Sequence, residues 1–112
     1  MDRLIARSTS LSECEAARKR IERELEALAI AEDEGRSEDV YHHLVTIGTC
    51  LGVLNKPRES LEYFKRAVDE FPDRRLPLWV VIMTLSHLGD EDELVKYTKL
   101  YEERFPPRDR TR

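Results

Sequence analysis

Apolar residues recur along most of the chain at steps of three and four, the spacing of one face of an α-helix. Glycines and prolines fall between these runs, and Val, Ile and Thr never alternate with polar residues over the length of a strand. The pattern therefore predicts an all-α chain. Its helices are expected at residues 10–34, 39–54, 57–71, 75–88 and 91–105.

The chain also matches itself when it is displaced by 34 residues, so that residues 41–74 pair with residues 75–108. The matches fall on the apolar spacing and on a closing Phe-Pro. The identical pairs are Leu44/Leu78, Leu51/Leu85, Leu54/Leu88, Glu59/Glu93, Tyr63/Tyr97, Lys65/Lys99, Phe71/Phe105, Pro72/Pro106 and Arg74/Arg108. This period predicts two copies of one helix–turn–helix unit, with breaks at Asn55-Lys56-Pro57 and Gly89-Asp90-Glu91.

The repeat resembles that of tetratricopeptide repeat proteins, whose 34-residue unit carries a W-x2-L-G-x2-Y…A-x3-F…P pattern. The first copy reads Leu44-x2-Ile47-Gly48-x2-Leu51, then Ser60-x3-Phe64, Ala67 and Pro72. The second reads Leu78-x2-Val81-Ile82-x2-Leu85, then Leu94-x3-Thr98, Tyr101 and Pro106. Leucine replaces the first aromatic residue in both copies, and Thr98 and Tyr101 depart from the pattern. The resemblance implies a short right-handed α-solenoid of about five helices.

We expect residues 1–112 to form a single domain, in which a loose arm (1–9) precedes the N-terminal helix (10–34). Residues 109–112 are expected to form a frayed tail. Ser10 and Glu13 form a capping-box pattern at the predicted start of the helix. The apolar seam of this helix packs on the first repeat in one interpretation and forms an intermolecular coiled coil in the other. Its residues are Leu11, Cys14, Ala17, Ile21, Leu25, Leu28 and Ile30.

The formal net charge is −4, and the acidic excess lies in residues 1–40. Such a chain has no basic footprint for nucleic acid. Its longest apolar stretch, Leu78–Met83, is too short to span a membrane, and residues 1–10 lack the apolar run of a signal peptide. The sequence therefore predicts a soluble cytoplasmic protein without membrane insertion.

No group of residues has the spacing of a catalytic or metal site. Cys14 and Cys50 lie in apolar helical faces and are expected to be buried free thiols. The histidines His42, His43 and His87 have no Cys or carboxylate at metal-ligand spacing. Cys50 lies seven residues from His43, two helical turns away, so a nucleophile–base pair is not favoured. We expect no enzymatic activity, no metal and no cofactor.

The first helix of each tetratricopeptide repeat lines a concave groove, and the resemblance carries that role to two sets of positions. They are His42, Val45, Thr49, Gly52 and Val53 in the first copy, and Leu76, Trp79, Met83, Ser86 and His87 in the second. These positions hold no Lys, Asn or Arg, the residues with which chaperone-binding members clamp a C-terminal carboxylate. In the alternative, the N-terminal helix covers the groove and packs Trp79 against Leu25 or Leu28.

These observations favour a protein-interaction module, a small adaptor or chaperone that binds a helix or extended segment of another protein in a mainly apolar groove. The alternatives are a self-associating structural protein and an inhibitor or immunity-type protein that masks an enzyme. A homodimer is one expected form, because the last helix carries more apolar and aromatic residues than one buried face needs. These residues are Leu94, Val95, Tyr97, Leu100 and Tyr101.

Overall fold

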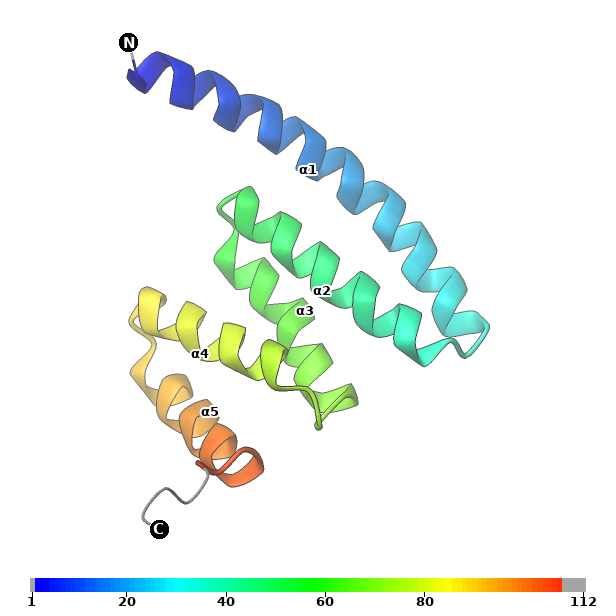
Figure 1. Cartoon of the computed structure of the whole chain (residues 1–112), viewed down its shortest axis with the longest axis vertical. Helices are drawn as coiled ribbons and strands as arrows, with labels where there is room; N and C mark the ends of the chain where they lie inside the picture. Colours follow the sequence, from blue (N-terminus) through cyan, green and yellow to red (C-terminus); the bar gives the residue numbers. More distant parts are fainter. Residues whose placement is uncertain (1, 108–112) are drawn as a thin grey trace. The chain divides into compact units, whose positions relative to one another are not determined.

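The computed structural model describes residues 2–107, with side chains from residue 11 onward. Within this range the chain forms five α-helices and no strand (Figure 1). They are α1 (Asp2–Asp33), α2 (Ser37–Val53), α3 (Pro57–Glu70), α4 (Arg75–Leu88) and α5 (Glu91–Arg104). The predicted all-α class is confirmed. The handedness of a solenoid stays a prediction.

Helix α1 begins at Asp2, whereas the sequence predicted a loose arm over residues 1–9. The Ser10–Glu13 pattern therefore lies inside the helix and caps no end. The physical reason is that no glycine or proline precedes Gly35, so nothing interrupts a helix once it has formed. The other helices agree with their predicted bounds to within two residues. The predicted tail, residues 109–112, lies outside the described residues.

Three of the interhelical turns share one hydrogen-bond pattern. Each has a residue with positive φ: Gly35 at 69°, Asn55 at 58° and Gly89 at 74°. After α4, the amide of Asp90 donates to the Leu85 carbonyl at 3.1 Å and that of Gly89 donates to Ser86 at 3.2 Å. The turns after α1 and α2 repeat both bonds, which together form the Schellman motif. Asn55 and Gly89 are 34 residues apart, so the repeat extends to the turn geometry.

The chain divides into two compact units, Met1–Tyr63 and Phe64–Arg112, with the boundary inside α3. In the first unit α1 lies along α2, and the short turn at Gly35 makes the two helices antiparallel (Figure 1). In the second unit α4 packs against α5. The prediction of a single domain over residues 1–112 stays a prediction.

Each unit has a buried apolar core. In the first unit, the buried side chains are Ala17, Leu28, Ala31, Val40, Tyr41, Leu44, Ile47, Leu51 and Leu61. In the second, they are Phe64, Ala67, Val68, Pro77, Leu78, Val81, Leu85 and Tyr97. Every position that carries the repeat pattern in the first copy, Leu44 through Ala67, is buried. The Ser60 hydroxyl donates to the Gly48 carbonyl at 2.7 Å, so two small residues allow α2 and α3 to approach closely.

The seam of α1 is used within the chain, as the first of the two interpretations expected. Ala17, Leu28 and Ala31 are buried, whereas Leu11, Leu25 and Ile30 are exposed. The buried stripe runs through Glu24, which lies three residues after Ile21 and four before Leu28. The predicted seam was therefore wrong at Leu11, Leu25 and Ile30. Beside Leu25, a paired carboxylate takes the inward position.

Candidate partner-binding surface

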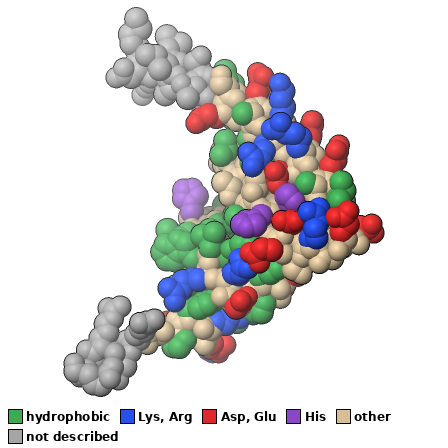
Figure 2. Space-filling view, turned by 45° about the vertical axis from the view of Figure 1, so that its right-hand side comes forward, with side chains coloured by type: hydrophobic (Ala, Val, Ile, Leu, Met, Phe, Trp, Pro, Cys, Tyr) green, Lys and Arg blue, Asp and Glu red, His purple; other side chains and the backbone are tan. Residues whose placement is uncertain are grey.

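Three large apolar side chains are exposed on one face of α4. Leu76, Trp79 and Met83 are 48%, 50% and 51% exposed. At 100° per residue they fall within one narrow sector of the helix, and they span about 10 Å along its axis. We call these three residues the α4 strip. Figure 2 shows exposed hydrophobic side chains, drawn green, at the molecular surface.

The opposite face of α4 is fully buried. Pro77, Leu78, Val81 and Leu85 form it, and Gly89 closes the helix in the left-handed conformation. Helix α4 is therefore apolar on both sides, a composition typical of a helix that is covered all round. Within its own unit only one side is covered.

A positively charged side chain lies at the amino end of the α4 strip. The helix contains no Asp or Glu, and its single charged side chain, Arg75, follows an Arg74 N-cap that makes no side-chain capping bond. The guanidinium of Arg75 lies 5.2 Å from the centre of the Phe105 ring, which holds it beside Leu76. The amino end of the strip is therefore positive, through Arg75 and through the helix dipole.

The predicted lining positions of α2 form a less apolar face. His42, Thr49 and Gly52 are exposed, and Val53 is 49% exposed. The Thr49 hydroxyl donates to the carbonyl of Val45, a half-buried residue, at 2.8 Å. Helix α1 packs on another side of α2, so the predicted α2 lining is not covered by it. Val53 is the one exposed apolar side chain of this face, and Val45 is half-buried.

The structure brings the predicted site residues together in two groups, one on α2 and one on α4. His87 and Ser86 are exposed at the carboxyl end of α4, next to the strip. Trp79 is 50% exposed. The alternative, in which the N-terminal helix packs against it, stays a prediction. A groove that joins the two groups stays a prediction.

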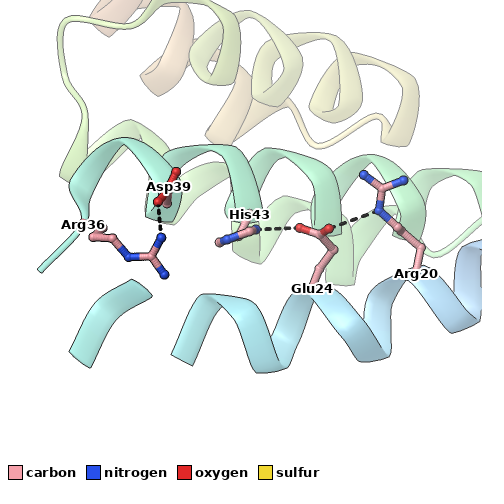
Figure 3. Close-up of polar contacts among 5 residues, drawn as sticks. All are labelled: Arg20, Glu24, Arg36, Asp39 and His43. Atoms are coloured by element: carbon pink, nitrogen blue, oxygen red, sulfur yellow. Dashed lines mark hydrogen bonds and ion pairs between the residues drawn. The ribbon is translucent and has the colours of Figure 1, made fainter. Parts of the chain in front are cut away.

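A polar cluster that the sequence did not predict connects α1 and α2 (Figure 3). Glu24 accepts a hydrogen bond from Arg20 Nε at 3.1 Å, and its other oxygen lies 2.7 Å from His43 Nδ1. The side chains of Glu24 and His43 are 14% and 21% exposed. Beside this cluster Arg36 contacts Asp39 at 2.6 Å and Glu34 at 2.9 Å across the turn. Glu24 lies three residues after Ile21 and four before Leu28. This helical spacing could have indicated that Glu24 faces the buried side of α1.

The cluster does not extend to a nucleophile. Cys50 lies two turns beyond His43, about 10 Å along the axis of α2. Burial raises the pKa of the Cys50 thiol, and the nearby Arg20 charge only partly offsets this, so the thiol is favoured over the reactive thiolate. Cys14 and Cys50 are free and half-buried. They were expected to be buried free thiols: they are free, but only half-buried.

Glu24 gives the fold a pH dependence whose direction follows from its contacts. Burial alone would raise its pKa, but the hydrogen bonds from His43 and Arg20, with their charges, outweigh burial and hold the pKa below its ordinary value. A carboxylate with a depressed pKa in the folded state stabilises the fold above the ordinary pKa of about 4.3, and this stabilisation is lost as the pH falls through the folded value.

We therefore expect Glu24→Gln to reduce the free energy of unfolding by about 1–3 kcal/mol at pH 7 and to flatten its decline between about pH 5 and pH 3. Urea denaturation at a series of pH values measures both effects. Glu26→Gln, on the exposed side of the same helix, is the matched control and should change neither. An unchanged acid profile in Glu24→Gln would contradict a structural role for the cluster.

In the second unit, polar contacts join α3 to α5. Lys65 Nζ lies 2.7 Å from Glu93 Oε1, and Arg104 donates to the Val68 carbonyl at 3.2 Å. The hydrogen bond between Lys65 and Glu93 raises the pKa of the lysine and lowers that of the glutamate. Tyr97 is buried, while the outward positions of α5 are charged apart from Val95. Helix α5 thus presents a polar side to water, unlike α4.

Among the residues with described side chains, no three His, Cys, Asp or Glu residues lie close enough to bind a metal ion together. Over the same part of the chain, no helix combines the length and the apolar character needed to cross a bilayer. Comparison with models of protein families, with curated proteins and with solved structures finds no match. The resemblance to tetratricopeptide repeats therefore rests on the sequence repeat and remains a prediction.

Proposed function

We propose that this protein is a protein-interaction module that binds its partner through the α4 strip. The observation that carries the proposal is the exposure of Leu76, Trp79 and Met83 on a helix whose opposite face is already buried. Tryptophan and other aromatic residues are enriched among the side chains that dominate binding energy. Methionine adds an unbranched side chain that adapts to a partner's shape.

An adaptor or chaperone role fits this surface better than a self-associating structural protein does. A self-associating structural protein would need a larger surface, and the outward side of α5 is mostly charged. An inhibitor or immunity-type protein would use the same kind of surface to mask an enzyme, so it differs from an adaptor only in the identity of the partner. The described residues show no nucleophile–base contact that would support catalysis.

The proposal predicts that Met83→Asp abolishes partner capture without affecting folding. Met83 is 51% exposed, so the charge remains hydrated in the free protein, but it is desolvated in a complex. The measurement is affinity capture from a lysate of the cells that produce the protein, followed by mass spectrometry. Val95→Asp is the matched control, because Val95 is 66% exposed and lies on α5.

Proteins retained by the wild type and by Val95→Asp, but lost with Met83→Asp, are the expected partners. Equal retention by all three proteins would place the interaction elsewhere on the chain. If the wild type retains nothing, the proposed function is wrong.

A further inference from the structure

We infer that the occupant of the α4 strip is an amphipathic helix with an acidic residue next to its apolar ridge. This inference rests on the proposed function and specifies the partner. It follows from three observations: the absence of a strand edge in residues 2–107, the positive charge at one end of the strip, and the small area of the strip.

A helical partner follows from the need to satisfy backbone hydrogen bonds. An extended ligand that binds by strand addition needs a strand edge, and the described residues contain no strand. Apart from the amides of its first turn, the backbone groups of α4 are bonded within the helix and at its Schellman turn. A helix brings its own hydrogen bonds, so it can bury an apolar face here at no cost in unpaired backbone groups. Side chains at i, i+3 and i+7 form a ridge that fits the groove of another helix.

The charge of the partner follows from the amino end of α4. Helices α2, α3 and α5 each carry an acidic residue in the first turn, whereas α4 carries Arg75 and no acid. The guanidinium carbon of Arg75 lies over the Phe105 ring, 5.2 Å from its centre, and guanidinium N–H groups can donate to a carboxylate. An acidic residue of the partner placed over Leu76 meets both Arg75 and the positive end of the helix dipole. A basic residue at that place would be repelled by both.

The size of the strip favours a single helix over a second copy of this chain. Three side chains that are each about half exposed offer roughly 300 Å² of surface, within the range of functional patches on monomeric proteins. A stable dimer buries about 800 Å² on each partner. A helix of a few turns matches the length and width of the strip.

The test uses two synthetic helical peptides that share one apolar ridge and contain no tryptophan. They differ only in the residues beside the ridge, which are Glu in one peptide and Lys in the other. Trp79 is the sole tryptophan of the chain and is half exposed, so its emission should shift to shorter wavelength when a peptide covers it. We expect the Glu peptide to bind at least about fivefold more tightly at low salt, with the difference falling as ionic strength rises.

Arg75→Gln should remove the preference for the Glu peptide and leave the shift of Trp79 emission at saturation unchanged. Arg58→Gln, at an exposed position of α3, is the matched control and should retain the preference. A Lys peptide that binds as tightly as the Glu peptide overturns the inferred charge while leaving the α4 strip as a binding surface. No emission shift with either peptide overturns the inference of a helical occupant.

Light scattering completes the test on the protein alone. A monomer at high micromolar concentration is expected. A dimer that dissociates in Met83→Asp would show that a second copy occupies the strip, and would overturn the inference. Failure of the proposed function itself is read separately, from the lysate capture, where it appears as equal retention by Met83→Asp or as no retention by the wild type.

Discussion

Replacing Phe64 with alanine should reduce the free energy of unfolding by about 3–5 kcal/mol. Phe64 is 3% exposed, and its helical neighbours Ser60, Ala67 and Val68 are buried with it. The substitution removes a large apolar side chain from a packed core and leaves a cavity that small neighbours cannot fill. Because a domain of this size is stabilised by about 5–15 kcal/mol, the loss is a large fraction of the total.

Urea denaturation followed by circular dichroism and by Trp79 fluorescence measures this effect. The first signal reports all helices and the second reports α4. Phe105→Ala is the matched control: Phe105 is only partly buried, and one face of its ring contacts Arg75. It should cost less, about 1–2 kcal/mol. A loss below about 1 kcal/mol in Phe64→Ala would show that Phe64 is not part of the core, and would remove the physical basis for the repeat pattern.

The helices and turns of this protein were predictable because they depend on local sequence. Asn55 and Gly89 can adopt positive φ at low cost, so each marks the end of a helix that apolar spacing had already indicated. The start of α1 was not predictable in the same way. Capping patterns at Ser10 mark a possible start, but a helix begins there only if the preceding residues prefer another conformation. Residues 2–9 do not prefer another conformation, and the helix begins at Asp2.

The Glu24–His43 contact could not be predicted from a hydrophobic pattern, because a paired charge occupies an inward position that the pattern assigns to an apolar residue. Leu25 was selected on apolarity, and it is 41% exposed. The same limit applies to the partner-binding surface. The sequence identified Leu76, Trp79 and Met83 from a resemblance, but their exposure depends on which faces the rest of the fold covers. Only the structure gives that information. It shows three exposed large apolar side chains on α4 and one on α2.

Replacing Trp79 with alanine should separate binding from stability. The side chain is 50% exposed, and alanine has the higher helix propensity, so the gain in propensity partly offsets the packing lost on the buried side. We therefore expect the melting temperature to change by no more than about 2–4 °C. Binding should weaken by about 2 kcal/mol or more, which is roughly a thirtyfold rise in Kd, because an aromatic anchor at the centre of a small strip contributes a large share of the binding energy.

Because the substitution removes the only fluorescent tryptophan, binding is measured by anisotropy of a labelled Glu peptide or by calorimetry with a captured partner. Trp79→Phe should recover part of the affinity, since it keeps an apolar ring in the strip. Leu25→Ala on α1, at an exposed apolar position outside the strip, should leave the affinity unchanged. A loss of 3–5 kcal/mol in stability on Trp79→Ala would instead be the cost of emptying a core site. That outcome would mean that Trp79 is covered in solution, and the binding surface would have to lie on another face of the protein.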